Sequence, residues 1–152
     1  MDIKIKLSRE ENISYFGTEE VILDLERYLR GVVASEIGNS HVEACAAQAI
    51  ASRTYALNTI AANGYITDKS SIHQAFRASR LTGYDNAYKG VELTQGEILI
   101  YNNKIAQCYY YASNGGKTTS SKERWGGDYA YLISQLDEYD KGPKNGHGVG
   151  MS

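Results

Sequence analysis

The stretch from Val42 to Ala62 contains neither glycine nor proline, so it can form one long, uninterrupted helix. Ser40 and Glu43 form the capping-box pattern that marks the start of a helix, and Gly64 suits the left-handed residue that follows a helix end. The many alanines of this stretch make the helix narrow, so that neighbouring elements can approach it closely. A chain of this length is therefore expected to pack its other elements around this helix.

A second helix is predicted just before it, because residues 25, 28, 29, 32 and 33 are apolar at helical spacing. It should end around residues 35–38. Residues 3–7 alternate between apolar and polar, as a half-buried strand does, and further short strands are expected at 12–17 and 21–23.

The second half of the chain is less regular. Residues 64–90 predict a long irregular connection with one helical turn near 86–90, and residues 98–111 predict a hairpin turning at Asn102-Asn103. A Ser/Thr/Gly-rich loop at 112–128, a weak strand at 131–133 and a glycine-rich tail are expected after it. We found no internal repeat and no linker. The sequence predicts one α+β domain over residues 1–152, with two packed helices against small, mostly antiparallel sheets and long loops that form a groove.

Composition excludes several classes of function. The net charge of −2 and the pI near 5.9 argue against nucleic-acid binding, which needs a basic surface. No apolar run is long enough to span a membrane, and no secretion signal is recognisable. The chain contains thirteen Tyr but only two Phe and one Trp. This excess of tyrosine suits a sugar-binding surface, but it fits equally well with Tyr replacing Phe in strands. Two cysteines, Cys45 and Cys108, are interpreted as buried free thiols.

Glu36 is the first candidate for chemistry. It lies between two apolar helices, where apolar neighbours and a helix C-terminus would raise its pKa, while the next helix N-terminus would lower it. A raised pKa suits a general acid, but these residues alone favour a solvated loop carboxylate over a catalytic group. Arg53 falls in the middle of the apolar stripe of the long helix, and a buried charge needs a partner. Glu36 is one available partner, in a site or in a purely structural ion pair.

Two further segments carry polar side chains. Residues 109–118 predict a strand followed by a loop that carries hydroxyl, amide and amine groups. The glycine and lysine spacing of a phosphate-binding loop is absent from this segment. His147 stands between glycines and could point into a site or be an ordinary loop residue. The three histidines follow no metal-ligand pattern, and neither a serine elbow nor a Cys–His signature is present.

Several motifs together resemble the SpoIID (stage II sporulation protein D) family, also called SpoIID/LytB domains. They follow the order of that family and span nearly the whole chain: Leu25 to Glu36, Ala46 to Ala56, Gln74 to Phe76, Tyr110 to Thr118, and Gly146 to Ser152. The resemblance implies a lytic transglycosylase in the bacterial cell envelope or outside the cell, acting on peptidoglycan glycan strands that typically lack stem peptides. It places the catalytic glutamate on Glu36 and the motif arginine on Arg53. Supporting or substrate-binding roles fall on Ser35, Gln48, Gln74, Tyr110, Tyr111, Ser113, Asn114, Lys117 and His147.

Three departures from the family pattern matter. Tyr111 and Ala112 replace a His and a Ser of the strand-to-loop motif, which leaves Glu36 more isolated as an acid–base group. Only His73 remains of a Cys/His cluster that can hold zinc in some relatives, so we predict no metal and no cofactor. Relatives usually continue past Ser152 with a helical segment, so part of the fold could be missing here.

The mechanism expected from the resemblance needs one carboxyl group. Neutral Glu36 would protonate the oxygen between N-acetylmuramic acid and N-acetylglucosamine, and then deprotonate the muramic 6-hydroxyl, which attacks C1. Arg53 would hold Glu36 in place. One alternative is a two-carboxylate hydrolase that uses Asp137 or Asp140. Another is a non-catalytic glycan-binding module that recruits an amidase or another cell-wall hydrolase.

Overall fold

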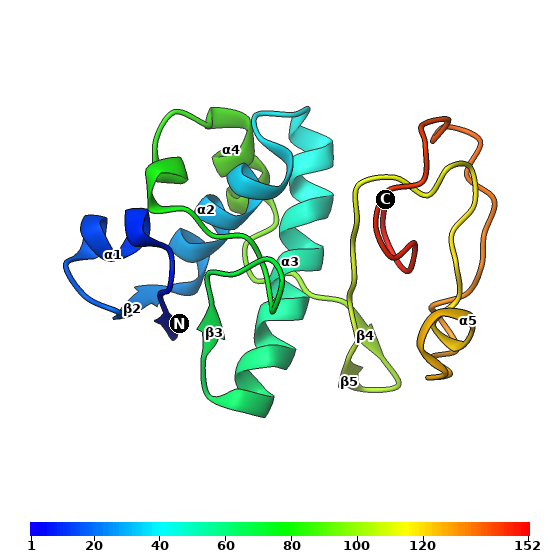
Figure 1. Cartoon of the computed structure of the whole chain (residues 1–152), viewed down its shortest axis with the longest axis horizontal. Coiled ribbons are helices and arrows are strands. Elements are labelled where there is room, and N and C mark those ends of the chain that lie inside the picture. The colour runs from blue at the N-terminus through cyan, green and yellow to red at the C-terminus, as the bar shows by residue number, and fades with distance from the viewer. The chain divides into compact units, whose positions relative to one another are not determined.

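The computed structural model describes residues 1–152, and the contacts within it group them into two compact units, residues 1–107 and 108–152 (Figure 1). Helices and small sheets follow one another without the regular strand–helix alternation of α/β folds, so the predicted α+β class is confirmed. None of the helices combines the length and the apolar character that crossing a membrane requires.

A three-stranded sheet forms one wall of the first unit. Its central strand β1 (Asp2–Lys6) pairs antiparallel with β2 (Glu20–Asp24) and parallel with β3 (Ile66–Thr67). In this register Ile5 lies between Val21 and Ile66. Ile3 and Ile5 are buried whereas Lys4 is not, so β1 shows the alternation that its sequence predicts.

Two helices, α2 (Leu25–Ile37) and α3 (Val42–Asn63), pack against this sheet and against each other, and α4 (Asp85–Leu93) packs against both of them. The Asp24 carboxylate caps α2 by accepting the backbone N–H of Glu26 at 3.0 Å. α3 ends at Gly64, which has a φ of 76° and the left-handed conformation expected of it. Gly90 lets α4 cross α3 at close range, since a Cβ there would lie 2.6 Å from the backbone of Cys45.

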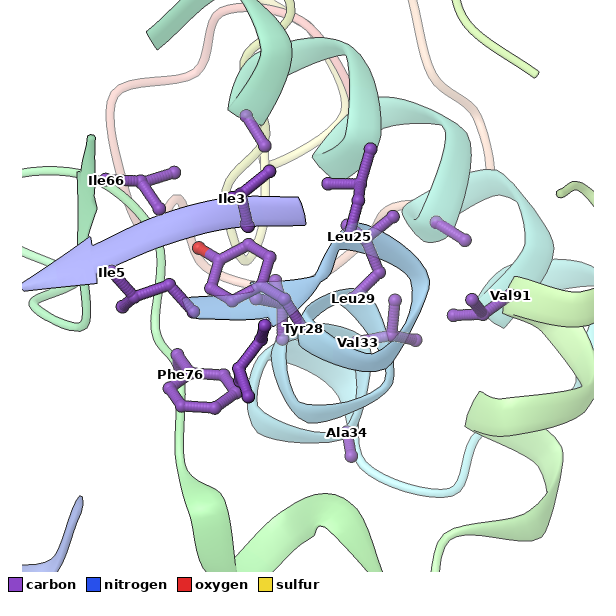
Figure 2. Packing of buried hydrophobic residues seen from close by; sticks show 14 of the residues in the cluster. Ile3, Ile5, Leu25, Tyr28, Leu29, Val33, Ala34, Ile66, Phe76 and Val91 are labelled. Carbon is purple, nitrogen blue, oxygen red and sulfur yellow. The ribbon is translucent and has the colours of Figure 1, made fainter. Parts of the chain in front are cut away.

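The core lies between the sheet and these helices. Figure 2 shows Ile3, Ile5 and Ile66 of the sheet on one side of α2 and Val91 of α4 on the other. Burial of one large apolar side chain contributes roughly 1.5–3 kcal/mol, so the inner face of α2 anchors the first unit. The apolar residues of α2 with no exposed surface are Tyr28, Leu29, Val32, Val33 and Ala34.

A buried polar cluster joins the sheet to the segment that follows β3. The fully buried Asp68 carboxylate accepts hydrogen bonds from Ser8, Arg9 and Asn12. Burial alone would raise the pKa of Asp68, but these hydrogen bonds outweigh it and lower that pKa. Asn12 also donates to the carbonyl of Phe76 at 2.9 Å and accepts the N–H of Ala78 at 2.7 Å. Residues 76–78 are therefore fixed to the rest of the unit.

The structure corrects three predictions about the first unit. Residues 12–17 are not a strand, because α1 (Glu10–Phe16) occupies them and ends at the left-handed Gly17. The turn expected near 86–90 is the longer helix α4, and a short 3₁₀ helix, η1 (Ala78–Leu81), precedes it. Ser40 does not cap α3; its hydroxyl donates to the Ile37 carbonyl within the turn between α2 and α3.

The hairpin prediction is confirmed, although its strands are short. β4 (Ile100–Tyr101) and β5 (Lys104–Ile105) pair antiparallel around Asn102 and Asn103, which have φ angles of 48° and 59°.

The second unit is built mainly from loops that pair with one another. The segment at Tyr109–Ser113 hydrogen-bonds to the glycine-rich tail, with Tyr111 N–H donating to the Met151 carbonyl and Ser113 exchanging two bonds with Asn145. One short helix, α5 (Ser121–Trp125), interrupts the loop expected at 112–128. Residues 131–133 form no strand, so that prediction was wrong.

Candidate active site

Glu36 lies in the last turn of α2 and is partly buried. Its Oε1 accepts the backbone N–H of Ala75 at 2.8 Å. The contact links α2 to the segment that Asn12 fixes through Phe76 and Ala78. The structure thus gives Glu36 a defined position against backbone rather than the freedom of a loop carboxylate.

Tyr28 lies about two turns before Glu36 on the same helix and is fully buried. Its ring stacks on Phe76 at 5.2 Å, and its hydroxyl lies near Gln74 without a hydrogen bond of good geometry. Burial raises the pKa of Tyr28 well above its ordinary value, and the charge of Glu36 adds to this effect. Tyr28 is therefore a neutral phenol within electrostatic range of the Glu36 carboxyl group.

Gly31 sets the distance between α2 and the segment that holds Glu36. A Cβ at this position would lie 2.6 Å from the ring of Phe76, which is fully buried and stacked on Tyr28. The Phe76 ring can therefore reach its place only because residue 31 has no side chain.

Gly31→Ala is expected to destabilise the protein by up to about 2 kcal/mol, since overpacking costs about 1–3 kcal/mol and the higher helix propensity of Ala offsets roughly 1 kcal/mol of this cost. Any activity that depends on Glu36 should fall as well, because a displaced Phe76 moves the neighbouring Ala75 N–H away from Glu36. Urea unfolding and an activity assay measure the two effects. Adding Phe76→Leu should restore part of both; a single variant as stable and active as the wild type would refute this role of Gly31.

Two of the predicted supporting residues meet in the interior of the first unit. Gln48 Nε2 donates to the Ser52 hydroxyl at 2.9 Å, and Gln74 Nε2 donates to the Ser52 carbonyl at 3.3 Å. Both glutamines are buried, and Gln74 precedes the residue that binds Glu36. The hydroxyl of Ser35 turns back to the Gly31 carbonyl of its own helix at 2.6 Å. These side chains fit a supporting layer around α2 and α3.

Arg53 binds a different glutamate from the one we expected. Its guanidinium forms a bidentate pair with Glu26, with Nε–Oε1 and Nη2–Oε2 distances of 2.9 and 2.6 Å. Its other N–H groups donate to backbone carbonyls of Ala49, Val91 and Glu97. Because α2 and α3 form a hairpin, the middle of α3 lies opposite the start of α2, about 15 Å along the helix from Glu36. The expectation that Arg53 holds Glu36 was therefore wrong, and Arg53 joins α2, α3 and α4.

The remaining predicted residues all lie in the second unit: Tyr110, Tyr111, Ser113, Asn114, Lys117 and His147. Pairing of the 109–113 segment with the tail brings His147 to 5.2 Å from the ring of Tyr111. The Nδ1 atom of His147 accepts the Val149 N–H at 3.0 Å, and burial lowers the pKa of this imidazole. His147 is therefore neutral at neutral pH. Lys117 is exposed.

Ser113 and Asn114 bind two carboxylates of the same unit. The Ser113 hydroxyl donates to Asp140 at 2.8 Å, and the Asn114 amide donates to Asp137 at 2.7 Å. Hydrogen bonds from Ser152, from the Asn114 N–H and from Ser113 lower the pKa of Asp140 to about 2. The Asn114 side chain likewise lowers the pKa of Asp137. Both carboxylates are ionised at neutral pH, so neither is suited to be a general acid.

Sequence reasoning missed two aromatic features. The helical spacing identifies Tyr28 only as an apolar position, although a tyrosine hydroxyl within an apolar stripe is itself a signal. Trp125, the single tryptophan of the chain, stands before Gly126-Gly127 and contacts the rings of Tyr109 and His147. No three His, Cys, Asp or Glu side chains in residues 1–152 are grouped as metal ligands would be.

Comparison with known proteins gives consistent matches. The family model described as SpoIID, stage II sporulation protein, matches residues 18–101. The amidase enhancer of Bacillus subtilis (strain 168) is 35% identical over 116 residues, which cover 74% of this chain and 15% of that protein. Stage II sporulation protein D of the same organism is 30% identical over 137 residues, covering 78% of this chain and 40% of that protein. The protein of the same name from Bacillus amyloliquefaciens is 31% identical over 140 residues. The chain thus matches less than half the length of each of these relatives.

Proposed function

The chain belongs to the stage II sporulation protein D (SpoIID) family, and from this premise we propose that it is a lytic transglycosylase that cleaves peptidoglycan glycan strands with Glu36 as its single proton-transferring residue. A relative is named an amidase enhancer, and the family name refers to sporulation, so the coarser assignment is a role at the bacterial cell wall. The observation that carries the finer proposal is the placement of Glu36, which is partly buried and anchored to the Ala75 N–H, with the neutral Tyr28 within electrostatic range.

In the proposed reaction Glu36 begins as a neutral carboxylic acid. Its proton goes to the glycosidic oxygen as the bond from muramic C1 to that oxygen breaks, and the N-acetylglucosamine end leaves as an alcohol. The Glu36 carboxylate then takes the proton of the muramic 6-hydroxyl while O6 forms a bond to C1. The products are a 1,6-anhydromuramyl end and a free hydroxyl, and Glu36 regains its proton without consuming water.

The contacts of Glu36 suit this double role. The Ala75 N–H holds Oε1 of the carboxyl group in a defined orientation. A fixed acid within hydrogen-bond reach of both oxygens of the substrate contributes through position as well as through proton transfer. The ionised state of Asp137 and Asp140 also favours a mechanism in which neither serves as the acid.

The second candidate function is a non-catalytic module that binds glycan and recruits an amidase. The observation in its favour is the 35% identity to a protein named amidase enhancer.

Purified protein incubated with glycan strands stripped of stem peptides separates the two functions. We expect shortened strands to appear without any added amidase. If strands stay intact at all protein concentrations, while a cell-wall amidase becomes faster in the presence of the chain, the recruiting module is the correct function.

A further inference from the structure

The second unit carries an exposed aromatic surface that the proposed reaction at Glu36 does not use. Trp125 is the only tryptophan of the chain, and 48% of its surface is exposed. It occupies the last position of α5, which is capped by the Ser120 hydroxyl at one end and by the left-handed Gly126 at the other. An exposed indole is an unusual use of the largest apolar side chain, which core positions normally bury.

Other aromatic rings hold the indole in place. The Tyr109 ring lies 4.9 Å from it at 59°, and the His147 ring lies 5.2 Å from it at 53°. Tyr111 in turn contacts His147 at 5.2 Å. We call the rings of Tyr109, Tyr111, Trp125 and His147 the aromatic platform. Tilted and edge contacts of this kind are favourable beyond the area that they bury.

The backbone beneath the platform is rigid. Met151 N–H donates to the Tyr109 carbonyl and Tyr111 N–H donates to the Met151 carbonyl, both at 3.0 Å, so the segments that carry the rings are paired. Gly150 permits this pairing, since a Cβ there would collide with the Tyr109 carbonyl. The His147 ring is fixed by its bond from Val149. A ligand that stacks on a ring already fixed loses little conformational entropy on binding.

The size and surroundings of the exposed ring favour a sugar over a protein partner. Charged side chains of Lys122, Arg124 and Asp128 lie around Trp125 along the chain, so its apolar surface is interrupted within α5 itself. A stable protein interface usually needs about 800 Å² on each partner with an apolar centre. A pyranose ring instead offers one apolar C–H face of about the area of an indole, with a rim of polar groups that can reach such charged neighbours.

We propose that the aromatic platform is a glycan-binding subsite in which one N-acetylhexosamine ring stacks on Trp125. The identity of the strand as peptidoglycan glycan rests on the proposed function, whereas the stacking itself does not. Trp125 binds and positions sugar in this proposal and takes no part in proton transfer.

The single tryptophan gives a direct measurement on the whole chain. We titrate the Glu36→Gln variant, which should not cut its ligand, with chitotetraose and with glycan strands stripped of stem peptides, and record tryptophan fluorescence. The proposal predicts a saturable shift of emission to shorter wavelength, because a stacked sugar removes water from the indole. If calorimetry detects binding of these glycans while the emission of Trp125 does not change, the subsite is not at Trp125.

Substitution provides the second test. Trp125→Ala is expected to weaken glycan binding about tenfold or more in calorimetry, which corresponds to the loss of one well-formed contact. Ile133→Ala removes another exposed apolar side chain of the same unit and should change affinity by no more than about twofold. Circular dichroism checks that both variants fold, and Trp125→Phe, which keeps a smaller ring, should lose less affinity than Trp125→Ala. Equal affinity of Trp125→Ala and the wild type overturns the proposal.

These experiments fail independently of the proposed function. If the protein cleaves glycan but the emission of Trp125 does not respond to bound glycan, the proposed lytic activity stands and the proposed subsite is wrong. If the emission of Trp125 responds to glycan but no cleavage occurs, the proposed subsite stands and the chain acts as a glycan-binding module.

Discussion

Glu36→Gln is expected to lower the rate of glycan cleavage by about three to four orders of magnitude, the upper part of the range for general acid–base catalysis, because one residue supplies both the acid and the base. Glutamine keeps the shape of the side chain, and its amide oxygen can still accept the Ala75 N–H that Glu36 accepts at 2.8 Å. The fold and the affinity for glycan should therefore stay close to those of the wild type. Product release from stripped glycan strands, followed by chromatography, measures the rate.

Glu43→Gln is the matched control, since Glu43 is an exposed glutamate near the start of α3, a short distance along the chain from Glu36. We expect it to cleave glycan at the wild-type rate. A folded Glu36→Gln protein that retains more than about a tenth of the wild-type rate would show that Glu36 does not transfer the proton. Loss of a general acid typically lowers the rate by about a hundredfold or more.

Arg53→Met should have the largest effect on stability, about 2–4 kcal/mol, because it leaves the partly buried Glu26 carboxylate without its buried partner. Arg53 is 1% exposed, and its loss would strand the Glu26 carboxylate and the carbonyls of Val91 and Glu97. Urea unfolding followed by the helical circular dichroism signal measures the change. Since Arg53 does not contact Glu36, the folded fraction of the variant should cleave glycan at nearly the wild-type rate per molecule.

Arg27→Met provides the comparison for this variant, because Arg27 is an exposed arginine beside Glu26 and should change stability by about 0.5 kcal/mol or less. A double variant, Arg53→Met with Glu26→Leu, should recover part of the loss by removing the unpaired carboxylate as well. Equal stability of Arg53→Met and Arg27→Met would contradict the structural role assigned to Arg53.

Local rules in the sequence predicted the parts of the fold that depend on neighbouring residues. The extent of α3 followed from an unbroken run between Ser40 and Gly64, and the hairpin followed from two asparagines that tolerate positive φ. The end of α2 near residue 37 was also predicted, and with it the location of Glu36 at a helix terminus.

Long-range contacts account for what the sequence did not reveal. Residues 12–17 alternate too briefly to distinguish a strand from a helix, and Asn12 is placed by its bonds to Asp68 and Phe76, more than fifty residues away. Arg53 lies in the apolar stripe of α3, so the sequence indicates that it needs a partner. That this partner is Glu26 follows only from the antiparallel packing of α2 and α3. The approach of Ala75 to Glu36 could not be derived from any local pattern, because the segment between β3 and η1 is irregular.

Cleavage of stripped glycan strands in water enriched in heavy oxygen tests the central claim most directly. If the Glu36 carboxylate regains its proton from the muramic 6-hydroxyl, the new ends are 1,6-anhydromuramyl groups, and mass spectrometry finds no heavy oxygen in them. Incorporation of one heavy oxygen at the new muramic end, with a reducing sugar as product, would mean that water is the nucleophile and that the chain is a hydrolase.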